Sequence, residues 1–362
     1  MRVLHLAAGN LYGGVERILV EIARSGGPRH EFALSFEGRL SRELDAAGAR
    51  RHAIGAVRFR RPLSIWLARR RLRTLLRAKA FDALVCHSPW PYAIAAPAID
   101  TPPVLWAHDA QRGDHWTERR VAARPPSLVI CNSRYTAATF GTWLPDTRRE
   151  VVYAPVSPLV RSFPRWEMRA RLGAADDTVV IVIASRFERW KGHGELLQAL
   201  TTLSGKWMLW IAGGPQRPHE HEYEAELRRL SAAPALADRV RFLGERTDVG
   251  NLLAAADIHC QPNSAPEPFG IAFVEALHAG LPVVTSDAGG AKEIVTADCG
   301  VLVAPGDIDA LRAALANLVS DRDARARMGA AGPARARELC DPERQVASLE
   351  QVLAGVSPRA AA

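Results

Sequence analysis

The chain has 362 residues, 48% of them hydrophobic and 24% charged, a composition that supports a sizeable core and excludes a disordered chain. Its length predicts two domains, and its longest apolar runs fall far below the roughly 18 residues that suggest a membrane-spanning helix. The formal net charge of +8 permits nucleic acid, an anionic membrane or phosphorylated compounds as partners, so the distribution of charge must decide among them.

The N-terminus and the cysteines bear on the location of the protein. The first apolar run leads directly into a glycine turn and an amphipathic helix, which is not the pattern of a cleaved signal peptide, and we expect a cytoplasmic protein. The five cysteines show neither CxxC nor Cys/His spacing. We therefore expect no disulfide framework and no structural metal site, and interpret the cysteines as small buried side chains.

Short apolar runs alternate with amphipathic segments along the chain, which is the pattern of parallel sheets with crossover helices. The runs that we interpret as strands are residues 2–7, 81–86, 103–108, 127–132, 178–185, 206–213, 239–244, 256–262, 281–286 and 300–305. The sequence therefore predicts an α/β protein of two Rossmann-like, doubly wound domains with about six strands each, facing each other across a cleft.

Three prolines between residues 153 and 166 interrupt this pattern and mark the domain boundary. We place an N-terminal domain at 1–160 and a C-terminal domain at 161–345. A C-terminal helix and tail at 346–362 could pack back on the first domain.

The first strand ends in a turn with paired glycines. Residues 15–23 carry the apolar stripe of a helix, so Gly13 and Gly14 fall at its N-terminus, where backbone N–H groups and the helix dipole favour an anion. The turn is not a GxGxxG fingerprint, and the chain has no GK[ST] motif of a P-loop. The glycines are therefore either a phosphate-binding turn or a plain strand-to-helix connection.

Most of the excess positive charge lies in one block. Residues 50–79 contain eleven Arg or Lys and no acidic residue, and a helix beginning after Pro62 would carry several of them beside an imperfect apolar stripe. This helix either covers the domain with a basic outer face, or the block 58–79 holds the domain against the anionic inner face of the cell membrane. We expect no nucleic acid as a partner, because the chain has no recognition motif and its aromatic residues form no stacking platform.

The second half opens with a buried strand, a cationic loop and a helix that begins near Gly192. Arg186 and Lys191 follow the strand directly, and a planar guanidinium together with a compact ammonium suits a diphosphate. The alternative is a solvated loop. The position of the loop at the carboxyl end of a central strand favours binding.

Two carboxylates stand eight positions apart in "APEPFGIAFVEALHAG", at Glu267 and Glu275. If a helix begins near Phe269, the two acids are separated by roughly 12 Å along its axis, which matches the length of a nucleoside diphosphate sugar. One acid would accept hydrogen bonds from sugar hydroxyls and the other from ribose hydroxyls. The alternatives are a helix-flanking acid and a surface helix residue.

Two DxD sequences, at 307–309 and 321–323, match the letters of a divalent-metal motif. Both begin helical patterns, where Asp is a favoured cap, so we interpret them as caps and expect no metal.

These stretches resemble the retaining GT-B glycosyltransferases of the family-4 type, which include many bacterial cell-envelope sugar transferases. Residues 267–277, "EPFGIAFVEAL", resemble the E-x7-E motif of that family. Further stretches occur in the family's order at 13–16, 132–137, 185–192, 242–258, 279–295 and 300–311. The resemblance covers essentially the whole chain and is closer in the C-terminal half than in the N-terminal half, where the acceptor binds in such enzymes.

The resemblance implies a role for each matching residue. Glu267 would face the transferred sugar, and His108 stands where the family often has a sugar-facing histidine, although a strand-end histidine is equally a structural residue. Glu275 would hold the ribose, and the base would lie near Leu243 to Arg246. The full set of residues that would bind the donor is Gly13, Gly14, Arg186, Lys191, Leu243, Arg246, Phe269, Gly270, Ile271 and Glu275.

The implied reaction is retaining transfer of a sugar from a UDP- or GDP-sugar to a glycan or lipid-linked acceptor in envelope polysaccharide or glycolipid synthesis. In such enzymes the departing diphosphate is proposed to take the acceptor's proton, so we expect no dedicated base. We also expect no metal and no other cofactor. The alternatives are a nucleotide-sugar epimerase of the same fold, which would need no acceptor, a noncatalytic sugar-nucleotide sensor and a basic nucleic-acid-binding protein.

Overall fold

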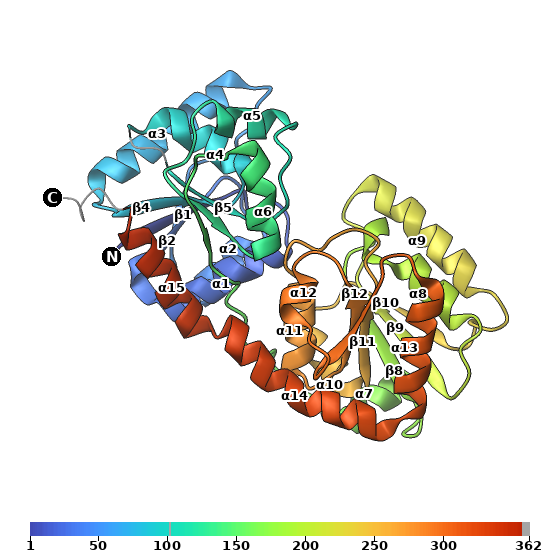
Figure 1. Ribbon diagram of the computed structural model, residues 1–362. Coiled ribbons are helices and arrows are strands. Elements are labelled where there is room, and N and C mark those ends of the chain that lie inside the picture. The colour runs from blue at the N-terminus through green and yellow to red at the C-terminus, as the bar shows by residue number, and fades with distance from the viewer. Residues whose placement is uncertain (101–102, 357–362) are drawn as a thin grey trace. The chain divides into compact units, whose positions relative to one another are not determined.

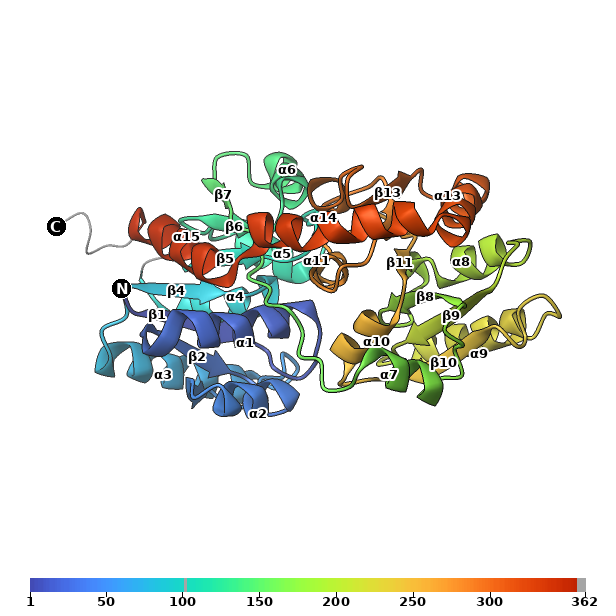
Figure 2. The same cartoon turned by 90° about the horizontal axis from the view of Figure 1, so that it is seen from below.

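The computed structural model describes residues 1–100 and 103–356. The chain divides into two compact units, which we call the N-unit (residues 1–156 with the C-terminal segment from Cys340) and the C-unit (residues 157–339). Each unit contains one parallel sheet, so the predicted pair of Rossmann-like α/β domains is confirmed. Figures 1 and 2 show the helices that cover both faces of each sheet.

The sheet of the N-unit has seven strands in the order β3-β2-β1-β4-β5-β6-β7. The strands are β1 Val3–Ala7, β2 His30–Leu34, β3 Arg50–Ala53, β4 Ala83–Cys86, β5 Val104–Ala107, β6 Val129–Cys131 and β7 Arg149–Val151. The helices are α1 Gly14–Gly26, α2 Arg39–Ala46, α3 Pro62–Ala78, α4 Pro89–Ala95, α5 Trp116–Ala122, α6 Arg134–Trp143 and α15 Pro342–Ala354. Helices α2 and α15 both pack against α1, whereas α3 and α5 both pack against α4.

The sheet of the C-unit has six strands in the order β10-β9-β8-β11-β12-β13. The strands are β8 Val179–Ala184, β9 Trp207–Ala212, β10 Val240–Gly244, β11 Ile258–Gln261, β12 Val283–Ser286 and β13 Gly300–Val303. The helices are α7 Arg165–Arg171, α8 His193–Leu200, α9 Pro218–Ser231, α10 Val249–Ala255, α11 Ile271–His278, α12 Ala291–Ile294, α13 Ile308–Ser320 and α14 Arg322–Cys340, whose last residue belongs to the N-unit.

All ten strands predicted from the sequence are present, but three strands of the N-unit were not predicted. Strands β3 and β7 lie at the two edges of the sheet and carry charged residues instead of an apolar run. Strand β2 is fully buried although it contains His30 and Glu31. Each buried polar group has a partner: Glu31 accepts hydrogen bonds of 2.7 Å from Arg2, His52 and Lys79.

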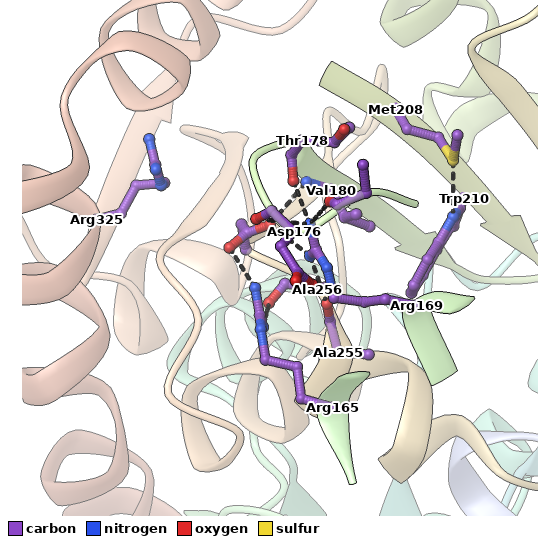
Figure 3. Close-up of polar contacts among 12 residues, drawn as sticks. Arg165, Arg169, Asp176, Thr178, Val180, Met208, Trp210, Ala255, Ala256 and Arg325 are labelled. Atoms are coloured by element: carbon purple, nitrogen blue, oxygen red, sulfur yellow. Dashed lines mark hydrogen bonds and ion pairs between the residues drawn. The ribbon is translucent and has the colours of Figure 1, made fainter. Parts of the chain in front are cut away.

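Two arginines, the buried Arg169 and the exposed Arg165, attach α7 to the sheet of the C-unit. Arg169 is 2% exposed and donates to the carbonyl of Ala255 at 3.0 Å and to the carboxylate of Asp257 at 3.1 Å. Figure 3 shows Arg165 beside it, reaching the carbonyl of Ala256 at 2.6 Å. The carboxylate of Asp257 also accepts the backbone N–H of Val180, so α7 and β8 share one anchor. This anchor fixes the strand that leads into the cationic loop.

Three further expectations concern the chain as a whole. All five cysteines are buried and free, as predicted. Within residues 1–100 and 103–356, no helix is long and apolar enough to cross a membrane. Helix α15 packs against α1 of the N-unit, and residues 357–362 of the expected C-terminal tail lie outside the described residues.

Candidate functional site

The strand order of the C-unit reverses between β8 and β11. The chain runs from β8 outward to β10 and then returns to place β11 on the other side of β8. Loops that leave two such neighbouring strands at their carboxyl ends separate, and open α/β sheets bind ligands in the crevice between them. Arg186 and Lys191 follow β8, whereas Glu267 follows β11, so the sheet brings these regions to one edge.

Lys191 and Glu267 form the centre of the candidate site. The Nζ atom of Lys191 lies 2.7 Å from Oε2 of Glu267, and the two side chains are only 15% and 11% exposed. The same oxygen accepts hydrogen bonds from Nδ2 of Asn263 at 3.0 Å and Nε2 of Gln261 at 3.3 Å. One carboxylate oxygen therefore receives three donors, and an ammonium and an acid are held side by side.

Close backbone packing fixes Glu267. Its carbonyl accepts the N–H of Gly290 at 2.7 Å, and it forms an isolated parallel bridge with Gly289. Gly289 has a φ of +67°, and a Cβ there would lie 2.2 Å from the carbonyl oxygen of Glu267. Only glycine fits this approach without strain. The "AGG" after β12 is thus a clamp on the acidic residue.

Lys191 is positioned by its own loop. It ends a short 3-10 helix, and its Nζ atom lies 3.8 Å from the centroid of the Trp190 ring. Gly192 directly precedes α8, near the expected start of the helix; it has a φ of +82°, and a Cβ there would lie 2.0 Å from the carbonyl oxygen of Pro262. The two loops at the switch point therefore touch through backbone, and the ammonium points to the carboxylate.

Arg186 is not part of the Glu267 cluster. Its guanidinium pairs with Glu188 at 3.0 Å and lies 4.0 Å from Glu220. Glu220 is itself fully buried and caps the N-terminus of α9 by accepting the N–H groups of Gln216 and Arg217. Arg186 thus remains beside the β8 loop, held by two acids.

The helix expected to begin near Phe269 begins two residues later. Helix α11 begins at Ile271, because Gly270 has a φ of +112° and cannot continue a right-handed helix. Glu275 is therefore little more than one turn into the helix, and the rise from Ile271 to Glu275 is about 6 Å. The 12 Å axial separation of the two acids does not hold. Glu275 is 4% exposed and Phe269 is also buried.

The residues expected near the base are separated from this cluster by the strand order. Leu243 lies in β10, at the edge of the sheet. Arg246 follows it and forms two hydrogen bonds with Asp248, at 2.7 and 2.8 Å. The guanidinium is thus already paired with a carboxylate two residues away.

The glycine turn of the N-unit has an internal partner. Gly13 precedes α1 and Gly14 is its first residue, as the sequence indicates, but the N–H of Gly13 donates to Oε2 of Glu16 at 2.9 Å. A carboxylate of the chain thus occupies the donor that a phosphate would use.

His108 follows β5 and is buried. Its Nε2 lies 3.0 Å from Nδ1 of His87, which follows the adjacent strand β4. Burial lowers the pKa of His108 to about 3, so the imidazole is neutral at physiological pH. It can accept or donate a hydrogen bond but carries no charge.

A pocket of about 680 Å³ opens at the carboxyl edge of the same sheet. Asn10 follows β1, Phe36 follows β2 and Trp90 follows β4, and the segment 57–61 closes the other side. That segment supplies three exposed arginines, and Phe59 packs edge-on against Trp116 with ring centroids 4.4 Å apart. The pocket therefore combines aromatic surface with positive charge.

Sequence reasoning missed the residues that complete these sites. Gln261 and Asn263 could have been found from the sequence, because two amide side chains at the end of a central strand are expected to be buried. Buried amides need hydrogen-bond partners. The glycine clamp at 289–290 and the ring of Trp190 carry no such signal. The DxD sequences act as caps, as predicted, because Asp307 accepts the N–H of Ala310 and Asp321 that of Ala324, both at 2.8 Å. Among the described residues, no group of three or more His, Cys, Asp or Glu is arranged to hold a metal ion.

Both units match known protein families. Residues 164–335 match a family model described as glycosyl transferases group 1, and residues 12–158 match one described as glycosyltransferase family 4. The two matches cover the C-unit and the N-unit separately. They agree with the family resemblance of the motifs.

Curated relatives match about half of the chain. A GDP-mannose-dependent monoacylated alpha-(1-6)-phosphatidylinositol monomannoside mannosyltransferase of Corynebacterium glutamicum is 36% identical over 50% of this chain and 48% of the relative. The lipopolysaccharide core biosynthesis mannosyltransferase LpsB of Rhizobium meliloti is 29% identical over 52% of this chain and 55% of the relative. The chain thus spans about half the length of the curated relatives that it matches.

A solved structure matches nearly the whole chain. The Anabaena protein HepE, solved in complex with UDP and glucose, is 27% identical, with a TM-score of 0.87 over 98% of this chain and 100% of that chain. The GT-B architecture of two Rossmann-like units is therefore shared over both units.

Proposed function

The chain belongs to the GT-B glycosyltransferases of group 1 and family 4, and on that premise we propose that it transfers a sugar from a UDP- or GDP-sugar to a glycan or lipid-linked acceptor with retention. The observation that carries the proposal is the contact of Lys191 with Glu267 at the switch point of the C-unit. An ammonium suits the departing diphosphate, and a carboxylate suits the sugar hydroxyls beside it. The proposed reaction belongs to envelope polysaccharide or glycolipid synthesis.

The donor residues take the roles that the motifs imply. Breaking the glycosidic bond builds negative charge on the diphosphate, which Lys191 and Arg186 stabilise together with the first N–H groups of α11. Glu267 binds the transferred sugar, and Glu275 binds the ribose. The departing phosphate accepts the acceptor's proton, so the reaction needs no dedicated protein base.

The nature of the donor and acceptor is supported by the names of similar proteins. HepE was solved with UDP and glucose, and two relatives are named mannosyltransferases, one of them dependent on GDP-mannose. The name of one relative refers to phosphatidylinositol monomannoside, and that of the other refers to lipopolysaccharide core biosynthesis. An amphiphilic, anionic acceptor fits the aromatic and basic pocket of the N-unit.

The exposed face of α3 supports a peripheral contact with an anionic membrane. Leu63 and Trp66 are 67% and 52% exposed, and the guanidinium of Arg70 lies 5.6 Å from the centroid of the Trp66 ring. An apolar patch beside cations is typical of a helix that lies on a lipid surface. In this arrangement the pocket of the N-unit meets a lipid-linked acceptor at the cytoplasmic surface of the membrane.

Three arginines of the basic block have a structural role instead. Arg69, Arg71 and Arg73 donate to the backbone carbonyls of Ile94, Ile54 and Ala98 at 3.1, 3.3 and 3.1 Å. Replacing them would disturb the packing of α3, so they are unsuitable for a membrane test. The suitable change replaces Leu63 and Trp66 with Ser and Arg70 with Gln.

Cosedimentation with vesicles tests the membrane contact. We expect wild type to bind vesicles with anionic lipid, to be released by salt, and to lose binding in the triple variant. Leu230→Ser, which removes an exposed apolar side chain from α9, is the control and should bind like wild type. Equal binding of wild type to neutral and anionic vesicles would contradict the proposal.

Calorimetric titration with UDP and GDP tests the donor site. Lys191→Met should weaken binding of the nucleotide that wild type binds, by about tenfold or more for a lost hydrogen bond to a charged group. Lys206→Met is the matched control, because Lys206 is an exposed lysine of the same unit paired with Asp177. Unchanged affinity in Lys191→Met would refute the assignment. Conversion of the nucleotide sugar without any acceptor would instead favour a nucleotide-sugar epimerase of the same fold.

A further inference from the structure

Four buried histidines form one continuous chain through the sheet of the N-unit. Nδ1 of His30 lies 2.8 Å from Nε2 of His5, Nδ1 of His5 lies 2.9 Å from Nε2 of His87, and Nδ1 of His87 lies 3.0 Å from Nε2 of His108. The rings belong to β2, β1 and the ends of β4 and β5, which are consecutive strands. This row of histidines crosses the sheet diagonally, since His30 lies level with Val3, two residues before His5, and His87 lies just beyond the Leu6–Cys86 pair.

The first ring of this histidine chain contacts a carboxylate on the C-terminal helix. Nε2 of His30 lies 3.2 Å from Oε1 of Glu350 in α15, and the same oxygen pairs with Arg29 at 3.2 Å. Gly26 makes room for the imidazole, since a Cβ there would lie 2.4 Å from the ring of His30. This row of histidines therefore begins beside the side chain of Glu350 and ends at His108.

The carboxylate determines which nitrogen of every ring carries the proton. A carboxylate only accepts, so His30 must donate from Nε2, and its Nδ1 must accept from Nε2–H of His5. The same rule repeats at His5 and His87, so Nδ1 of His87 accepts from Nε2–H of His108. Nδ1 of His108 is left without a proton. It is buried and has no hydrogen-bond partner among the described residues.

The four imidazole rings are neutral, which preserves this alternation of donating and accepting nitrogens. Burial lowers the pKa of His5, His87 and His108, and the neighbouring histidines lower the first two further. Burial also lowers the pKa of His30, although Glu350 opposes that shift. A neutral imidazole has one donor and one acceptor. Because Glu350 accepts from Nε2 of His30, the tautomer of that ring fixes the tautomers of the other three in turn.

We propose that Glu350, His30, His5 and His87 are positioning residues that hold His108 in the Nε2–H tautomer, so that its Nδ1 accepts a hydrogen bond from a sugar hydroxyl. The inference rests on the proposed function for the identity of the ligand, but the tautomer itself does not. A hydroxyl that donates to Nδ1 is oriented by its proton, which fixes its lone pairs for the rest of the site. The C-terminal helix thereby acts on the site through four side chains.

Nuclear magnetic resonance of protein with 15N-labelled histidine tests the tautomer without turnover. We expect His108 of the free wild type to carry its proton on Nε2. Glu350→Met should produce a mixture of the two His108 tautomers, because His30 then has no fixed acceptor at its Nε2; a Gln would not serve, since Arg29 would keep its amide oxygen in the accepting position. Glu343→Met, the same change at an exposed position of α15, should leave the tautomer unchanged. A proton on Nδ1 of His108 in wild type, or an unchanged tautomer in Glu350→Met, would overturn the proposal.

Steady-state kinetics with the best nucleotide sugar tests the effect on the reaction. We expect Glu350→Met to lower kcat about tenfold, the worth of one hydrogen bond, with the donor KM near that of Glu343→Met. A changed tautomer with unchanged kcat would overturn the positioning role. If wild type transfers no sugar, the proposed function fails, while the tautomer measurement still decides whether Glu350 sets the proton of His108.

Discussion

Replacing Glu267 with Gln separates the structural and the functional roles of this carboxylate. The amide oxygen can take the place of Oε2, so the donors from Lys191, Asn263 and Gln261 keep their acceptor. The volume and the backbone clamp are unchanged. What is lost is the negative charge beside Lys191 and the capacity of the second oxygen to accept a sugar hydroxyl.

Glu267→Gln should cost little stability, because the three donors keep their acceptor. A hydrogen bond to a charged group contributes about 1.5–3 kcal/mol and a neutral one about 0.5–1.5, so the change should destabilise the protein by about 1 kcal/mol. For a unit the size of residues 157–339, that lowers the melting temperature by about 2–4 °C. The affinity for UDP or GDP should be equal to wild type or higher, because Lys191 is no longer neutralised by a carboxylate.

Three measurements on Glu267→Gln check this prediction. Calorimetric unfolding gives the stability, titration gives the nucleotide affinity, and product formation gives turnover, which should fall about tenfold or more. Asp177→Asn is the control, since it removes a charge from an exposed pair with Lys206. Turnover equal to wild type, or a loss of nucleotide binding as large as that of Lys191→Met, would refute the assignment of Glu267 to the sugar.

Three further predictions concern the framework. Gly289→Ala should lower the melting temperature strongly and abolish transfer, because the Cβ would lie 2.2 Å from the carbonyl oxygen of Glu267, whereas Gly306→Ala, also at positive φ but with open space around it, should cost only about 1 kcal/mol. Arg169→Met should destabilise the C-unit by about 3–5 kcal/mol in chemical denaturation, since it leaves buried acceptors unpaired; a cost below 1 kcal/mol would contradict the anchor role. Hydrogen bonds from Arg2, Lys79 and His52 outweigh burial and lower the pKa of Glu31 from 4.5 to about 2, so its stabilisation is present above pH 4.5 and lost as the pH falls toward 2. Wild type should therefore lose about 3 kcal/mol more than Glu31→Gln over that range, and parallel stability profiles would contradict this.

The sequence predicts most of the architecture because buried parallel strands are continuous apolar runs. The predicted strands contain such runs, whereas the buried strand β2 begins with His30 and Glu31, and β3, with the sequence RRHA, has no apolar run. Its pairing with β2 comes from main-chain hydrogen bonds at a sheet edge, to which polar side chains are no obstacle.

The candidate site could be predicted only in part. Lys191 and Glu267 were both singled out, but 76 residues separate them, and their contact depends on β8 and β11 being neighbours. The start of α11 depends on the left-handed conformation of Gly270, which a glycine permits but does not require. The partner of the Gly13 N–H is likewise a side chain, Glu16, that a helix pattern alone leaves on the surface.

Release of nucleoside diphosphate from UDP-glucose and GDP-mannose tests the central claim most directly. Wild type should release UDP or GDP together with a glycosylated product only when a lipid or glycan acceptor is present, and Glu267→Gln should do so far more slowly. Release that is independent of every acceptor, or no release from any nucleotide sugar by a protein that binds neither nucleotide, would contradict the account.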